Sequence, residues 1–191
     1  MGQRLVVDLI QNDKVVAAIY YHWSAFFGST IYELAKLSKT ILKAEEENKD
    51  KLFTIIQMLE EDQVYQFMNE DKIRHGGICG SNEEIKAAMK LFPNYIPKRE
   101  NLNRNCGIIS FTEEGIKDFH DYEEGHAEIN LDTHEISNNV DLDPYPYTVD
   151  IYGNVSINGK TSSVNAWDCD CESVIELLDF LDENPKLKDG E

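Results

Sequence analysis

The chain has 191 residues, of which 41% are hydrophobic and 10% aromatic, and its formal net charge is −18. A chain of this length and composition can bury a core without disulfides or a metal ion, which excludes general disorder. The negative charge argues against direct binding to nucleic acid or to an anionic membrane, because both present phosphate. It favours a cationic partner, such as a basic protein groove or a metal ion.

The negative charge is concentrated in the last two-fifths of the chain. Residues 113–191 hold 21 of the 36 acidic side chains and four of the 18 basic ones, a formal charge of −17. Residues 1–112 hold 15 acidic and 14 basic side chains, a formal charge of −1. This segregation makes the C-terminal part the first place to look for function.

The N-terminal half predicts a hairpin followed by helices. Arg4–Ile10 and Lys14–Trp23 are rich in Val, Ile and Tyr and predict two strands that are covered on both faces. Thr30 and Glu33 form a capping-box pattern ahead of a helical apolar spacing. The other elements expected here are a helix over Lys51–Met68, a loop over Glu70–Gly80, a helix from Ser81 that stops before Pro93, and an irregular connection over Pro93–Asn105.

The C-terminal half predicts short strands between two helices. Thr112 can cap a helix that runs through Glu124 and stops at Gly125. Ala127–Leu131 and His134–Val140 predict a second hairpin with one solvated face. The other elements expected are strands over Cys106–Phe111, Thr148–Tyr152, Val155–Ile157 and Thr161–Val164, with a last helix over Asp170–Leu181.

This order of elements predicts one α+β domain over residues 1–191 with a mostly antiparallel sheet. A helical hairpin packs on the N-terminal strands, and the acidic, β-rich half ends in a helix. A division into a neutral part, 1–105, and an acidic part, 106–191, stays open. No apolar run approaches the roughly 20 residues of a membrane span, and the N-terminus lacks a signal-peptide pattern, so we expect a cytoplasmic location.

Metal and thiol motifs are weak in this sequence. Asp141 and Asp143, like Asp168 and Asp170, place two carboxylates at i, i+2, but the glycine and glutamate of a calcium-binding EF-hand loop are missing. Cys169 and Cys171 are spaced too closely for a CxxC motif. His75 and Cys79 offer two ligands without a second pair. We therefore expect no metal and no cofactor.

A cysteine or histidine enzyme is the main alternative from another class. Cys79 lies among glycines, and Cys106 lies beside a locally basic stretch. Either thiol would need a histidine close in space to act as a nucleophile. Because no catalytic signature has matching strength, we assign no catalytic residues. A metal-binding protein and a viral structural or assembly protein remain further alternatives.

Two stretches carry a resemblance to known proteins. They are Ile19–Ala25, which reads IYYHWSA, and Asn103–Ser110, followed by the Glu113–Glu124 helix and the Glu128–Asp132 strand. Together they resemble an uncharacterised family of phage and prophage proteins from Gram-positive bacteria. The resemblance implies a small accessory viral protein that acts in the cytoplasm of the host cell. By analogy of class, such acidic proteins are often inhibitors of host defence, including anti-CRISPR and anti-restriction proteins.

The charge and the resemblance together predict a non-enzymatic inhibitor that mimics nucleic acid. Its partner would be a basic, nucleic-acid-binding protein of the host, because carboxylates on a folded surface can present a field comparable to that of a phosphate backbone. The predicted partner-binding residues are Glu113, Glu114, Asp118, Asp121, Glu123, Glu124, Glu128, Asp132, Glu135, Asp141 and Asp143.

Overall fold

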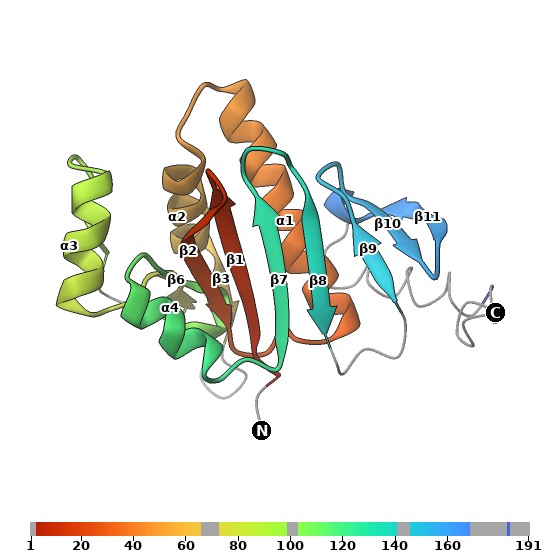
Figure 1. Ribbon diagram of the computed structural model, residues 1–191, viewed down its shortest axis with the longest axis horizontal. Helices are drawn as coiled ribbons and strands as arrows, with labels where there is room; N and C mark the ends of the chain where they lie inside the picture. Colours follow the sequence, from red (N-terminus) through yellow and green to blue (C-terminus); the bar gives the residue numbers. More distant parts are fainter. Residues whose placement is uncertain (1–2, 66–72, 99–102, 141–145, 169–182, 184–191) are drawn as a thin grey trace.

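The structure is an α+β fold built around one mixed β-sheet (Figure 1). It is a computed structural model that describes residues 3–65, 73–98, 103–140, 146–168 and 183. The expected last helix, Asp170–Leu181, lies outside the described residues.

The central sheet has six strands and joins both halves of the sequence. In spatial order the strands are β5 (Gly77–Ile78), β6 (Ile108–Ser110), β2 (Lys14–Tyr21), β1 (Leu5–Gln11), β7 (Gly125–Asn130) and β8 (Ile136–Val140). The neighbours β1–β2, β2–β6 and β7–β8 are antiparallel, which confirms both predicted hairpins. The pairs β1–β7 and β5–β6 are parallel, so the sheet is mixed, and three of its five strand pairs have the antiparallel pairing expected of most of the sheet.

The parallel pairing of β7 with β1 follows from the connection between β6 and β7. Strand β6 runs in the same direction as β1, because each of them is antiparallel to β2. Strand β7 also runs in this direction, because it is parallel to β1. Two strands with the same direction need a crossover, and helix α4 (Glu113–His120) supplies it. The helix therefore passes over β2 and β1, the strands that lie between β6 and β7.

One face of the sheet is covered by two helices, α1 (Phe27–Glu46) and α2 (Lys51–Glu61), which confirms the predicted helical hairpin. Figure 1 shows both behind the strands. Helix α1 begins earlier than the capping-box pattern predicted. Thr30 lies inside its first turn, where its hydroxyl donates to the Ser24 carbonyl oxygen instead of capping the helix.

The opposite face carries α4 and a smaller apolar cluster. Phe119 of α4 packs with Val6 of β1, Tyr20 of β2 and Ile108 of β6. Strands β1 and β2 are thus covered on both sides, as their apolar composition predicted. Thr112 caps α4 by accepting a hydrogen bond from the Gly115 amide, but the helix ends at His120 and Gly125 opens β7.

The remaining elements include a helix and a three-stranded sheet that lie at opposite sides of the central sheet (Figure 1). Helix α2 ends at Glu61, before the predicted Met68, and a short strand follows it.

The Asn158–Gly159 turn joins the last two strands of the three-stranded sheet, and both residues have positive φ, as a tight hairpin needs. The elements are β3 (Gln63–Tyr65) paired with β4 (Ile73–His75), helix α3 (Asn82–Leu91), and a sheet of β9 (Tyr147–Val149), β10 (Asn154–Ile157) and β11 (Lys160–Asn165).

Candidate functional site

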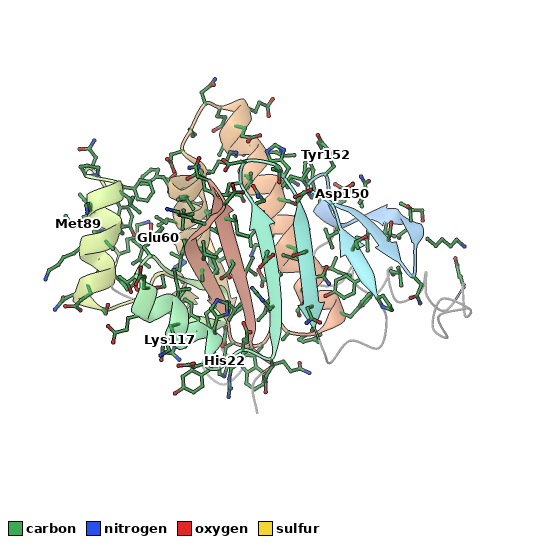
Figure 2. The ribbon with its side chains drawn as sticks, in the orientation of Figure 1. His22, Glu60, Met89, Lys117, Asp150 and Tyr152 are labelled. Atoms are coloured by element: carbon green, nitrogen blue, oxygen red, sulfur yellow. The ribbon has the colours of Figure 1, made fainter. Side chains whose placement is uncertain are left out.

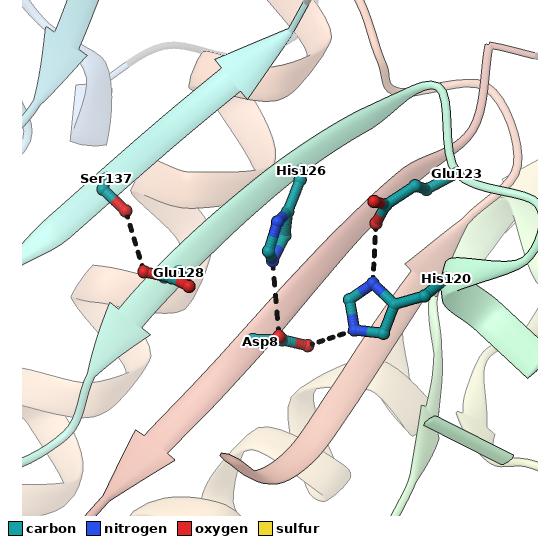
Figure 3. Close-up of polar contacts among 6 residues, drawn as sticks. All are labelled: Asp8, His120, Glu123, His126, Glu128 and Ser137. Atoms are coloured by element: carbon teal, nitrogen blue, oxygen red, sulfur yellow. Dashed lines mark hydrogen bonds and ion pairs between the residues drawn. The ribbon is translucent and has the colours of Figure 1, made fainter. Parts of the chain in front are cut away.

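A buried aspartate on the central strand is the starting point of the candidate site. Asp8 lies in the middle of β1 among apolar residues, and only 4% of its surface is exposed. A carboxylate buried to this extent loses its hydration and needs partners that replace it. Its side chain lies on the α4 face of the sheet, so these partners come from α4 and β7 (Figure 3).

Two histidines supply the partners of Asp8. His126 Nε2 lies 3.3 Å from Asp8 Oδ2, and His120 Nε2 lies 3.2 Å from Asp8 Oδ1. β7 runs parallel to β1, and His126 lies opposite Val6. Because Asp8 is two residues after Val6, its side chain lies on the same face of the sheet as that of His126. His120 comes from the last turn of α4, after the crossover.

A second carboxylate fixes the His120 ring from its other side. His120 Nδ1 lies 2.7 Å from Glu123 Oε2, three residues further along the chain (Figure 3). The imidazole therefore has a carboxylate at each nitrogen. Both nitrogens can face acceptors only if both carry protons or if a cation lies at one of them. We refer to Asp8, His120, Glu123 and His126 as the Asp8 cluster.

The Asp8 cluster is negatively charged and partly open to solvent. The side chains of His120 and His126 are 29% and 32% exposed, whereas that of Asp8 is 6% exposed. The hydrogen bond to Asp8 raises the pKa of His126 against the opposing effect of burial, and the charges of Glu123 and Glu128 add to the increase. Solvent or a small ion can thus reach the imidazoles.

The sequence analysis missed this cluster. Among the described residues, Asp8, His120 and His126 form a group of side chains that could hold a metal ion, because their ligand atoms all lie within 4.8 Å of one another. One signal was present: Asp8 is a lone charge inside a strand that the sequence predicts to be buried on both faces. The histidines gave no such signal, because the crossover and not their spacing brings them to Asp8.

Helix α4 is held in place by a buried glutamate of α3. Glu84 is 2% exposed, and its carboxylate accepts hydrogen bonds from the Ser110 hydroxyl at 2.5 Å and the Phe111 amide at 2.7 Å. It also accepts from the Thr112 hydroxyl at the start of α4. Gly115 permits this approach, since a Cβ there would lie 2.3 Å from Glu84 Oε1.

Five of the predicted partner-binding residues share the α4 side of the sheet. Exposed carboxylates lie at i, i+4 and i+7 along α4 and its C-cap, and Lys117 lies among them (Figure 2); they belong to Glu114, Asp118 and the C-cap residue Asp121. On β7, the register opposite Asp8 places an exposed glutamate on the same side. We define the anionic face as Glu113, Glu114, Asp118, Asp121 and Glu128.

The other predicted residues have different surroundings. Glu123 binds His120, and Glu124 accepts a hydrogen bond from the Arg4 amide, so both carboxylates are engaged within the chain. Asp132 and Glu135 are exposed at the β7–β8 turn, where Asp132 accepts from the Asn12 amide. Asp141 and Asp143 lie outside the described residues.

Lysines of the N-terminal part do not neutralise the anionic face in the described part of the chain. The lysine–carboxylate pairs there join Lys36, Lys49, Lys51 and Lys98 to acidic residues between Glu33 and Asp62. The charge segregation of the sequence is therefore kept in the ion pairing of the fold.

The cysteines do not form an activated thiol site in the described residues. Burial raises the pKa of the Cys79 thiol, and it raises the pKa of Cys106 to about 12. A nucleophilic cysteine needs the opposite shift, because the thiolate is the reactive form. Neither thiol joins the His/Asp group described above, and Cys169 and Cys171 lie outside the described residues.

No protein-family model matches the chain, and no curated protein or solved structure matches it either. Within the described residues, none of the helices combines the length and the apolar character needed to cross a membrane.

Proposed function

We propose that the protein is a non-enzymatic inhibitor whose anionic face occupies a basic, nucleic-acid-binding surface of another protein. The observation that carries the proposal is the group of exposed carboxylates on α4 and β7, which the described lysine pairs leave un-neutralised. The raised pKa values of Cys79 and Cys106 weigh against the thiol-enzyme alternative.

The spacing of the carboxylates determines how closely the anionic face can match the charge density of DNA. Glu114, Asp118 and Asp121 form a stripe along α4, with about one charge per 5 Å of helix axis at a rise of about 1.5 Å per residue. One DNA strand carries a phosphate about every 3.4 Å. The stripe alone is therefore less dense than DNA, and the remaining carboxylates of the anionic face must contribute to the field.

The resemblance to phage and prophage proteins suggests the class of target. A host-defence protein such as a CRISPR effector or a restriction enzyme binds nucleic acid through a basic groove, which is the complement of the anionic face. Complementary fields of this kind accelerate association and make it sensitive to salt. Inhibition would then require no chemical step by this chain.

The test is charge reversal combined with a salt series. The chain is immobilised, and the proteins that it captures from a bacterial lysate are identified and purified. The affinity of each captured protein is then measured for the unaltered chain and for the triple variant E114K/D118K/D121K. We expect binding to weaken by more than about tenfold, and K117E to strengthen it.

The matched control is the triple variant E46K/E61K/E83K, which reverses three exposed charges outside the anionic face. It should change affinity by less than about threefold. An affinity that stays the same from about 0.05 M to about 0.5 M salt, where the Debye length falls to about 4 Å, would refute electrostatic mimicry.

A further inference from the structure

We propose that Asp8, His120 and His126 bind one divalent transition-metal ion, with zinc as the first candidate. The proposed ligands are not residues of the anionic face, although Glu128 of that face lies beside them, and the inference does not depend on the proposed function. It rests on the distances within the Asp8 cluster, on the second carboxylate at His120 and on the kind of ligand atoms present.

The distances bring three ligand atoms close to the spacing of a tetrahedral ion. Zinc binds histidine nitrogen and carboxylate oxygen at about 2.0–2.1 Å, so neighbouring ligand atoms of a tetrahedral site lie about 3.3 Å apart. The Nε2 atoms of His120 and His126 lie 3.2 Å and 3.3 Å from the two oxygens of Asp8. All three ligand atoms lie within 4.8 Å of one another. Modest side-chain rotations are then enough to close the site around an ion.

Glu123 gives His120 the orientation that a metal ligand needs. Its carboxylate lies 2.7 Å from His120 Nδ1, so a neutral ring that donates from Nδ1 to Glu123 has its Nε2 lone pair directed at Asp8. A lone pair and a carboxylate repel each other unless a cation lies between them. Carboxylate–histidine–metal arrangements of this type are usual at protein metal sites, where the outer carboxylate fixes the ring.

The ligand atoms and the surroundings favour a transition metal over calcium. Calcium prefers six to eight oxygen ligands, whereas two imidazoles with one carboxylate suit zinc and its neighbours in the first row. Glu128 lies opposite Asp8 on β7 and adds negative charge next to the site. The partial exposure of both histidines leaves room for water as a fourth ligand.

The test is titration of the untagged full-length chain, freed of metal by a chelator, with zinc chloride in a calorimeter and with cobalt chloride in a spectrophotometer. We expect one equivalent of zinc with micromolar affinity or better, and visible absorption typical of tetrahedral cobalt. H120Q and H126Q should each weaken zinc binding by more than about 100-fold, and E123Q by about 10- to 100-fold.

Two controls locate the ion. H134Q changes a histidine that also pairs with a carboxylate, Glu45 at 2.8 Å, but belongs to no three-ligand group in the described residues, and it should bind zinc like the unaltered chain. The double variant C169S/C171S should also bind zinc like the unaltered chain. Loss of binding in either control would place the ion elsewhere and overturn the assignment.

Measurements on the unaltered chain remove any dependence on how the variants fold. In NMR spectra, the ring signals of His120 and His126 should shift on addition of one equivalent of zinc, while those of His22 and His134 stay in place. A dissociation constant weaker than about 1 mM, or zinc shifts confined to other histidines, would refute the site.

Discussion

Replacement of Glu84 by alanine should loosen the part of the molecule that carries both sites. Its carboxylate joins α3 to the end of β6 and to the first turn of α4, the helix that supplies His120 and most of the anionic face. Hydrogen bonds to a charged acceptor contribute about 1.5–3 kcal/mol each, and a buried donor left without a partner costs about 1–3 kcal/mol.

The size of the stability loss in Glu84→Ala depends on how deeply the three groups that donate to Glu84 are buried. Ser110 is completely buried, so its hydroxyl cannot turn to water after the change, whereas the Phe111 and Thr112 groups are partly exposed and can be rehydrated. We therefore expect Glu84→Ala to lower the free energy of unfolding by about 3–5 kcal/mol rather than by the full sum. For a chain of this length the melting temperature should fall by about 6–20 °C.

Urea unfolding followed by circular dichroism measures this loss, and hydrogen exchange of the α4 amides reports whether the helix loosens. Glu84→Gln keeps one acceptor oxygen without the charge, so its loss should be about half as large. Glu83→Ala is the matched control, because Glu83 is the exposed neighbour in the same helix turn. If E84A were no more destabilising than E83A, the proposed anchoring of α4 would be wrong.

Two further predictions concern buried titratable groups on the α1–α2 side and beside β6. Burial raises the pKa of Glu33 to about 7 against the opposing charge of Lys36, which lies 3.5 Å away, and the negative charge of Asp62 adds to the increase. The folded chain thus holds a proton that the unfolded chain releases above about pH 4.5, so this stabilisation is complete at lower pH and is lost as the pH rises through 7. Unfolding by urea at pH 5 and pH 8 should show a fall of about 1–3 kcal/mol that Glu33→Gln removes; an equal fall in the variant would contradict the assignment. The buried Cys106 thiol, with its pKa of about 12, should react with iodoacetamide at pH 8 at least about 100-fold more slowly in the folded chain than in urea, and a similar rate in both states would contradict its burial.

Local patterns in the sequence were sufficient to predict most of the elements. Alternation and apolar runs predicted β1, β2, β7 and β8, because a strand's two faces are encoded by neighbouring residues. Ser81 and Thr112 cap their helices as expected, since a cap depends on residues only three positions away. Element ends were less predictable: α1 begins at Phe27, which packs against Tyr147, and its N-cap residue Phe26 makes no side-chain cap hydrogen bond.

The sequence by itself determined the α+β class, the two hairpins, the helical hairpin and the unequal distribution of charge, all of which depend on composition and short-range spacing. Only the tertiary structure decided that β7 lies beside β1 and that α4 crosses the sheet above β2 and β1. That crossover brings His120 and His126 to Asp8 across more than a hundred residues of sequence. Contacts between such distant residues are set by strand order and direction, which no local pattern encodes.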